Sequence, residues 1–398
     1  MVPANRIKCI RRKKRQSTTV YQYQKNCRYL AQIADGLKEA GAEELSELGA
    51  EDISPDYSGV YFKADKSILY RINYQTRLIS RCLAPLISYA CNDTDTLYQK
   101  AKQIDWEDFI SSGNTFAVSA NVSNSAISHS KYAALRLKDA IADYFKEKTG
   151  MRPNVSVSNP DIQLNLNIRN NEAVIRFDTS GSALHRRGYR EETVSAPMQE
   201  TVAAAIIRLS KWDGSYPLYD PMCGSGTLLC EALMHYSKIP AGIFRTRFGF
   251  EFLPDFDNSV WKQVKNEADG HIIELPKGLI AGSDVSAEAV SMSQTNLMGL
   301  HYGKNVSIER SDFRKLPSLE NHVIVANPPY GIRMGKDENL KIFYKDLGDF
   351  LKQKCKGSNA FIFFGDRKYI KNIGLEASWK KPVKAGGLDG RLVKYELY

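Results

Sequence analysis

The stretch Asp220-Pro221-Met222-Cys223-Gly224-Ser225-Gly226-Thr227 follows two apolar residues and precedes a largely apolar segment at residues 228–236. A strand, a glycine-rich turn and a helix in this order are typical of the first unit of an open α/β sheet. Glycines let the turn approach a ligand closely, because no Cβ intervenes. Residue 229 is Leu, so the dinucleotide pattern G-x-G-x-x-G is not completed, and no phosphate-binding G-x-x-x-x-G-K-[ST] occurs. The turn therefore disfavours a pyrophosphate ligand.

Beyond this turn, segments with strand and helix character alternate. We expect strands at residues 218–220, 279–284, 306–309, 323–326 and 360–364, and helices at residues 227–236, 287–300 and 340–354. Strands separated by helices require right-handed crossovers and a parallel sheet covered on both faces. Residues 379–383 and 392–397 flank glycine-containing turns, which predicts a terminal antiparallel hairpin. The sequence thus predicts a Rossmann-like α/β domain with a mostly parallel, seven-stranded sheet over residues 181–398.

The N-terminal half has a different pattern. Residues 6–15 contain seven Lys and Arg and no acid, which accounts for most of the net charge of +10, so residues 1–27 are predicted to be a disordered basic arm. Strands are expected at residues 29–34, 60–64, 115–121, 163–169 and 173–178, and helices at residues 37–48, 68–82 and 131–148. Asn170-Asn171 predicts a hairpin turn. An α+β region over residues 28–180 is expected.

Composition excludes several classes of protein. The 398 residues are 43% hydrophobic and 25% charged, as in soluble globular proteins of two or three domains. The longest apolar run, residues 202–207, is far shorter than the roughly 18 residues that a membrane span needs. No secretory signal is recognisable, so a cytoplasmic location is expected. The seven cysteines form no C-x-x-C pair, which favours reduced packing residues over a zinc site or a disulfide framework, and no metal is expected.

Acidic residues end or follow the first three strands of the predicted sheet. Asp220 can orient the loop or bind the ammonium group of an amino acid, and Asp284 can accept hydrogen bonds from two ribose hydroxyls. Asp312 can accept a hydrogen bond from an adenine amino group, while Phe313 packs on the adenine ring. Ribose, adenine and a cationic tail without phosphate describe S-adenosylmethionine. Each acid alone is more often a helix cap or turn former. The predicted cofactor-binding residues are Asp220, Pro221, Cys223, Gly224, Gly226, Asp284, Asp312 and Phe313.

The fourth strand ends in Asn327-Pro328-Pro329-Tyr330. Two prolines remove two N–H donors and fix φ, so this turn presents carbonyl acceptors. The Asn327 side-chain oxygen and the Pro328 carbonyl can accept the two hydrogens of a planar exocyclic amine, which directs its lone pair at a methyl donor, while Tyr330 stacks on the base. These four residues are the predicted catalytic set. The alternatives are a turn after a buried strand, or a proline-rich ligand for another protein.

Three motifs together resemble class I S-adenosylmethionine-dependent RNA methyltransferases with an N-terminal THUMP domain, in particular the large-subunit rRNA guanine-N2 group. The motifs are His185-Arg186-Arg187-Gly188-Tyr189-Arg190 with Ala196-Pro197-Met198-Gln199-Glu200-Thr201, then residues 220–227, and Asn327-Pro328-Pro329-Tyr330-Gly331. The resemblance implies a ferredoxin-like and THUMP region that captures structured RNA. It also implies that residues 247–251, residues 256–257 and Trp261 form a wall beside the cofactor.

The implied reaction is methylation of guanine N2 in large-subunit rRNA. Adenine-N6 methylation of nucleic acid remains an alternative, because the tetrad at 327–330 serves that chemistry equally, as it does methylation of a glutamine amide. Guanine-N2 methylation of tRNA and a noncatalytic role in RNA assembly also remain open. Some bacterial relatives continue into a second methyltransferase domain, whereas this chain ends at Tyr398, so a single modification is expected. RNA is the expected partner, and the oligomeric state is not predicted.

Overall fold

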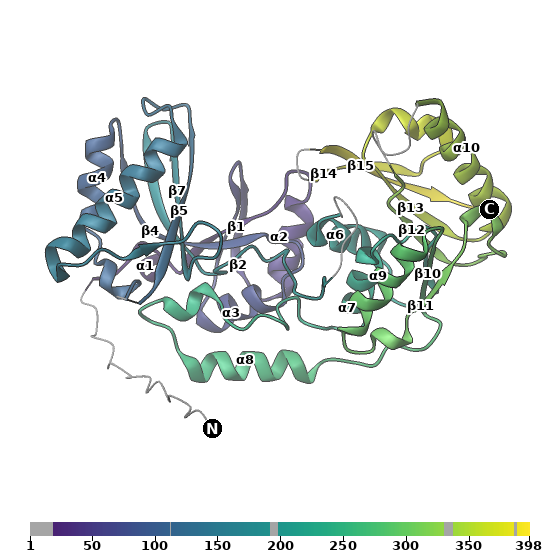
Figure 1. Cartoon of the computed structure of the whole chain (residues 1–398), viewed down its shortest axis with the longest axis horizontal. Helices are drawn as coiled ribbons and strands as arrows, with labels where there is room; N and C mark the ends of the chain where they lie inside the picture. The colour runs from purple at the N-terminus through teal and green to yellow at the C-terminus, as the bar shows by residue number, and fades with distance from the viewer. Residues whose placement is uncertain (1–18, 112, 192–197, 330–336, 386–387) are drawn as a thin grey trace, which may run out of the picture. The chain divides into compact units, whose positions relative to one another are not determined.

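The computed structural model describes residues 19–111, 113–191, 198–329, 337–385 and 388–398 (Figure 1). These residues form two compact units. One contains Cys27–Ala84, Ser182–Phe248 and Asp257–Tyr398, and the other contains Pro85–Gly181, Gly249–Phe256 and the described part of Met1–Asn26. Residues 1–18 of the predicted disordered arm lie outside the described ranges. Residues 19–27 are ordered, because α1 (Gln22–Asn26) forms there and Tyr21 and Tyr23 are buried, so the arm was predicted to extend too far. The domain boundaries expected after residues 27 and 180 stay a prediction.

A seven-stranded sheet organises the C-terminal part of the first unit. Its order is β11-β10-β9-β12-β13-β15-β14. The strands are β9 (Leu218–Asp220), β10 (Ile280–Asp284), β11 (Ser307–Arg310), β12 (Val323–Ala326), β13 (Asn359–Phe364), β14 (Trp379–Ala385) and β15 (Leu388–Glu396). β15 pairs antiparallel with both β13 and β14, and the other four pairs are parallel. The predicted class, a mostly parallel sheet with a terminal hairpin, is confirmed.

Helices cover both faces of this sheet. These helices are α6 (Glu200–Ser210), α7 (Thr227–Tyr236), α9 (Ala287–Met298) and α10 (Asp337–Lys354). A further helix, α8 (Asn258–Gly270), contacts α3 (Lys66–Gln75) instead of this sheet. Ile324 and Ala326 of β12 are buried in one cluster with α10, whereas α6 contacts β12 and β13. Since side chains alternate along a strand, Val323 and Val325 face the opposite side. Figure 1 shows α10 on one side of these strands and α6 and α7 on the other.

Four antiparallel strands of a larger sheet precede this domain within the same unit, and we refer to these four strands as the small sheet. Their order is β2-β3-β1-β4. The elements are β1 (Arg28–Gln32), α2 (Lys38–Glu47), β2 (Glu51–Asp56), β3 (Gly59–Lys63), α3 (Lys66–Gln75) and the start of β4 (Arg81–Ala90). The helix predicted at residues 68–82 is shorter than expected at its C-terminal end. It ends at Gln75, because the buried Glu44 carboxylate accepts hydrogen bonds from the Thr76 hydroxyl at 2.6 Å and the Arg77 amide at 2.8 Å, which requires non-helical backbone.

The second unit contains the hairpin that the asparagine pair predicts. Asn170 and Asn171 have φ of 52° and 60°, as a tight hairpin turn requires. The hairpin strands are β7 (Ile162–Arg169) and β8 (Glu172–Asp178), and β7 also pairs in parallel with β5 (Thr115–Ser123). The other elements are α1 (Gln22–Asn26), the end of β4, α4 (Thr94–Lys102), α5 (Ser130–Thr149) and β6 (Asn154–Val155). β4, α4 and β6 were not predicted.

Two residues of the basic motif at 185–190 are buried, Arg187 and Tyr189, whereas Arg186 and Gly188 are exposed. Arg187 is 1% exposed, and its Nε donates to the Glu231 carboxylate on α7 at 3.2 Å. Its other nitrogens donate to the carbonyls of Leu184 at 2.8 Å and Arg77 at 2.6 Å, and the Tyr189 hydroxyl donates to Glu231 at 3.1 Å. Arg77 follows α3, so this network joins the small sheet to the C-terminal α/β domain. These motif residues therefore have a structural role.

Replacing Glu231 with Gln should destabilise the protein strongly. The substitution leaves the buried Arg187 guanidinium without its counterion, and breaking such a pair costs about 3–5 kcal/mol. The free energy of unfolding from urea titrations measures the effect. Glu47→Gln is the control, because Glu47 is 61% exposed and pairs with Arg208 at the surface, where a loss below about 1 kcal/mol is expected. Equal stability of the two variants would contradict the structural role.

Candidate functional site

The glycine-rich loop is held against the end of β10. The Gly224 amide donates to the Asp284 carboxylate at 2.9 Å, and the Ser293 hydroxyl of α9 donates to the Gly224 carbonyl at 2.6 Å. Gly224 has φ of +55°, and a Cβ added there would meet nothing within 4 Å, so the loop presents bare backbone to open space. Gly226 has φ of +79°, and its added Cβ would lie 3.0 Å from the Ser293 hydroxyl. The two glycines thus serve ligand approach and helix packing respectively.

Two carboxylates stand at the ends of neighbouring strands. Asp220 ends β9, is 1% exposed and accepts a hydrogen bond from the Met222 amide at 3.1 Å. Burial, with a smaller contribution from Asp284, raises the pKa of Asp220 to about 8. Asp284 ends β10, and its second oxygen accepts from the Ser286 amide at 2.9 Å. A cationic group brought into this site would favour the ionised form of Asp220.

Asp312 and Phe313 follow β11 as predicted. The Asp312 side chain accepts from the Arg314 amide at 3.0 Å and forms an ion pair with the Arg314 guanidinium at 3.0 Å. Phe313 is buried, and its ring packs edge-on against Phe343 with centroids 5.4 Å apart. These contacts fix a rigid aromatic wall beside a carboxylate that retains acceptor capacity.

Asn327 carries a polar atom without a partner. Its Oδ1 is buried and accepts no hydrogen bond from any residue that the structure describes. Such an atom costs about 1–3 kcal/mol unless a ligand supplies a donor. The neighbouring Pro329 carbonyl accepts from the Tyr344 hydroxyl at 3.3 Å, which ties the turn to α10. Tyr330, the fourth residue of the predicted catalytic set, lies outside the described ranges.

One cavity of about 580 Å³ brings the predicted residues together. Its size is typical of small-molecule sites. The predicted residues that line it are Asp220, Pro221, Cys223, Gly224, Asp284, Asp312, Phe313, Asn327, Pro328 and Pro329. Gly226 does not line it and instead sits at the start of α7. Sequence reasoning missed Met198, Ser225, Thr227, Val285, Ser286, Ser311, Arg314 and Phe343, among others, although most adjoin a predicted residue in the chain.

The wall expected from residues 247–251, residues 256–257 and Trp261 is not beside this cavity. None of these residues lines it. Phe248 and Trp261 instead pack edge-on against Tyr74 of α3, with ring centroids 6.2 Å and 5.3 Å away. The insertion therefore packs against the helix of the small sheet. Its long α8 helix, which the sequence analysis did not identify, contacts the same helix α3.

The described residues contain neither a helix suited to crossing a membrane nor a group of side chains suited to binding a metal ion. Across them, no helix combines the length and apolar character that crossing a bilayer requires. Nor do the His, Cys, Asp and Glu side chains of these ranges form a group of three or more that could hold a metal ion. Of the seven cysteines, the six that are described are free thiols.

The fold and the cavity together define a class I methyltransferase that uses S-adenosylmethionine. Bare backbone at Gly224, acids at the ends of β9 and β10, and the Phe313 wall fit a cofactor with a cationic tail, a ribose and an aromatic base. The crystal structure of SMU.472 with bound SAH has the same fold, with a TM-score of 0.82 and 27% identity over 93% of this chain and 98% of that one. Use of S-adenosylmethionine follows.

The chain belongs to the RlmKL-type family of THUMP-domain RNA methyltransferases. Residues 187–394 match the family described as RMKL-like, methyltransferase domain. Residues 91–178 match the THUMP domain, and residues 28–83 match the RlmL ferredoxin-like domain.

Some similar proteins match this chain over nearly their whole length, and others match it over about half of their length. A Synechocystis protein with the provisional name RNA methyltransferase slr0064 is 38% identical over 93% of this chain and 97% of its own length. The ribosomal RNA large subunit methyltransferase K/L of Vibrio campbellii is 36% identical over 93% of this chain but 53% of its own length. This chain thus spans about half the length of the K/L relatives it matches.

The raised pKa of Asp220 predicts a pH-dependent stability. Between pH about 4 and 8 the folded protein holds a proton on Asp220 that the unfolded chain releases, so the free energy of unfolding falls as pH rises through this window. The slope from this group is at most about 1.4 kcal/mol per pH unit. Asp220→Asn should match wild type near pH 4 and exceed it at pH 8 in urea titrations of the cofactor-free protein. Glu288→Gln, an exposed control, should leave the pH profile unchanged. A wild-type-like profile for Asp220→Asn would contradict the assignment.

Proposed function

We propose that this protein transfers a methyl group from S-adenosylmethionine to the exocyclic N2 of a guanine in large-subunit rRNA. The observation that carries this proposal is the buried Asn327 Oδ1, which lines the cavity and has no donor among the described residues. A buried acceptor at the carboxyl end of a central strand is suited to a ligand amine. The two prolines that follow add carbonyl acceptors and no N–H donor.

The chain's own residues supply positioning. Asn327 Oδ1 and the Pro328 carbonyl accept the two hydrogens of the target amine, since the Pro329 carbonyl is already engaged by Tyr344. Accepting both hydrogens raises electron density on the nitrogen and turns its lone pair toward the cavity. The bound cofactor supplies an electrophilic methyl on a sulfonium. As the N–C bond forms, the S–C bond of the sulfonium would break and leave S-adenosylhomocysteine. The nitrogen becomes acidic in this step and would release its proton to solvent, so no strong base is required beforehand. Preorganised acceptors account for the catalysis.

The other residues that line the cavity are proposed to bind the cofactor. Asp220 forms an ion pair with the cationic tail of the cofactor. Asp284 accepts hydrogen bonds from the ribose hydroxyls and also from the Gly224 amide. Asp312 meets the adenine amine and Phe313 packs on its ring. Pro221 and Cys223 line the same cavity. Tyr330 is proposed to stack on the target base.

The substrate is proposed from the relatives and the N-terminal domains. The K/L relatives are named for large-subunit rRNA, and the THUMP domain supports capture of RNA. Adenine-N6 methylation and guanine-N2 methylation of tRNA stay the alternative reactions, because the same acceptors suit either amine. The cytoplasmic location expected from the sequence stays a prediction.

Removing the Asn327 acceptor should slow turnover and spare cofactor binding. Asn327→Ala should lower kcat about 10²–10³-fold, as loss of one preorganised transition-state contact does. The Kd for S-adenosylmethionine, measured by calorimetry, should stay near wild type. Asn327→Asp keeps an acceptor oxygen and should retain more turnover than Asn327→Ala. Asn359→Ala, at the opposite end of β13, is the control with full activity. Unchanged turnover in Asn327→Ala would reject the role.

The modified nucleotide is testable by mass spectrometry. Nucleosides from the rRNA and tRNA of a strain lacking this gene should show loss of N2-methylguanosine from large-subunit rRNA alone. Re-expression of wild type should restore it, and re-expression of Asn327→Ala should not. Loss of N6-methyladenosine, or loss confined to tRNA, would establish one of the alternatives instead. No change in any methylated nucleoside would favour a noncatalytic role.

A further inference from the structure

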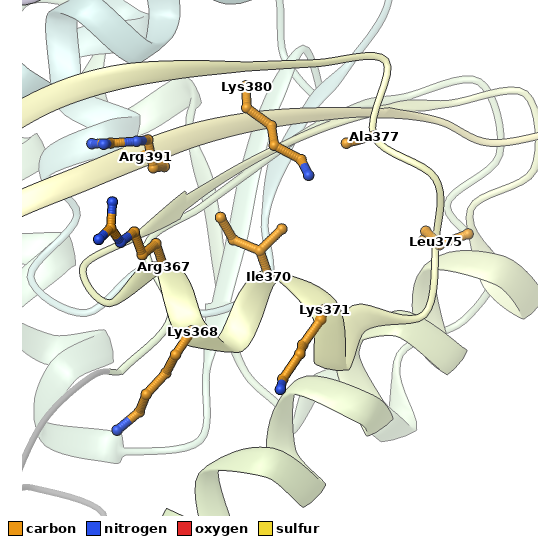
Figure 2. A pocket seen from close by; sticks show the side chains of 8 residues that line it. All are labelled: Arg367, Lys368, Ile370, Lys371, Leu375, Ala377, Lys380 and Arg391. Carbon is orange, nitrogen blue, oxygen red and sulfur yellow. The ribbon is translucent and has the colours of Figure 1, made fainter.

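A second cavity lies between the 3-10 helix η6 (Arg367–Ile373) and the terminal hairpin β14–β15. Its volume is about 510 Å³ (Figure 2). Ile370, Leu375 and Ala377 supply its apolar wall, and every other lining residue is basic. The basic residues are Arg367, Lys368, Lys371, Lys380 and Arg391. Nothing in the cofactor site described above uses these residues.

The positive charge of this pocket is only partly compensated. Asp389 pairs with Arg391 at 2.6 Å, and Asp366 pairs with Lys368 at 3.3 Å. Arg391, and from farther away Arg367, hold the pKa of Asp389 below its usual value. Five cations therefore face two carboxylates.

Three of the cations lack an acidic partner. Within the described residues, no carboxylate lies within ion-pair distance of Arg367, Lys371 or Lys380, and all three side chains are exposed. Figure 2 shows Arg367, Arg391, Lys371 and Lys380 around one pocket, with Ile370 among them. Like charges gathered in one pocket repel each other, and an anionic ligand relieves that repulsion.

The pocket lies at the edge of the sheet that carries Asn327. Ala326, which precedes Asn327, pairs with Ile362 of β13, and Arg391 of β15 pairs with Phe364, the last residue of β13. Strands are spaced about 4.8 Å apart, so Arg391 lies roughly 10 Å across the sheet from Asn327. η6 begins three residues after β13 ends at this same edge. Nucleotides that flank a target base in the cofactor cavity would therefore be within reach of Arg367 and Arg391.

We infer that this basic pocket binds backbone phosphates of the RNA nucleotides that flank the target base. The inference rests on the proposed function, because it assumes that an RNA base reaches Asn327. Phosphate contacts from Arg and Lys set the register of a nucleic acid without reading its sequence. A base presented to an enzyme out of its stack also needs its neighbours held. The pocket would therefore position the substrate strand while the acceptors at Asn327 act on the base.

The test removes the three unpaired charges together. Arg367→Gln, Lys371→Gln and Lys380→Gln are combined in the full-length protein. The matched control combines Lys277→Gln, Lys304→Gln and Lys356→Gln, three exposed lysines that precede β10, β11 and β13 at the opposite edge of the sheet. The probe is large-subunit rRNA from a bacterial strain lacking its K/L methyltransferase. RNA affinity is measured over a range of salt concentrations, with KM for RNA and Kd for S-adenosylmethionine alongside.

The pocket variant should bind RNA more weakly than wild type, and its RNA affinity should depend less on salt concentration. Each lost phosphate contact lowers the slope of log affinity against log salt by about 0.7 on single-stranded RNA, so a fall of up to about 2 is expected. KM for RNA should rise, while the Kd for S-adenosylmethionine stays at the wild-type value. The control variant should keep the wild-type slope.

Two results would overturn the inference. One is an unchanged slope and KM in the pocket variant while wild type methylates the probe. The other is an equal loss in both variants, which would mean a general effect of charge. If wild type binds the probe but methylates no RNA, the proposed function fails instead, and the slopes of the two variants still decide whether the pocket binds RNA. Binding of an acidic protein rather than RNA would leave both slopes unchanged.

Discussion

The hydrogen bond from the Gly224 amide to the Asp284 carboxylate determines where the cofactor cavity lies. It ties the loop after β9 to the end of β10, so that bare backbone and two carboxylates converge at one edge. The bond requires β9, β10 and α7 to pack closely. Gly282 permits this, because a Cβ there would lie 2.8 Å from Leu229 and 2.9 Å from the Asp220 carbonyl. A side chain at position 282 would push the strands apart and displace the loop with them.

The site contains polar groups that lower the stability of the cofactor-free fold. Asp220 is buried without a cation among the described residues, and Asn327 Oδ1 is buried without a donor. Both lie at strand ends whose preceding residues are packed in an apolar core, such as Ile324 and Ala326. That burial holds the two side chains in place despite their cost. Groups that are unfavourable alone and favourable with ligand are expected at functional sites.

Most of the site was predictable because its residues adjoin strands with strong periodicity. Leu218–Asp220, Thr227–Tyr236 and Val323–Ala326 have the predicted bounds, which placed Asp220 and Asn327 at the same edge. The position of the insertion was not predictable, since the rings of Phe248 and Trp261 fit either a cofactor wall or the Tyr74 side chain that they contact. Likewise the sequence shows seven Lys and Arg residues from 367 to 391, but only the hairpin register gathers five of them into one pocket.

The order of the strands places acidic residues on one side of Asn327 and basic residues on the other side. Asp220 and Asp284 end β9 and β10, whereas Arg367 follows β13 and Arg391 lies on β15. β12, which carries Asn327, lies between β9 and β13. Under the proposed function, the cationic methyl donor is attracted to the acidic half and the phosphates of the RNA to the basic half, so the two reactants approach Asn327 from opposite sides. A phosphate beside Asp220 and Asp284 would be repelled by like charge, which disfavours the opposite placement. In this proposal the strand order directs both ligands toward the uncharged acceptors at Asn327 and Pro328.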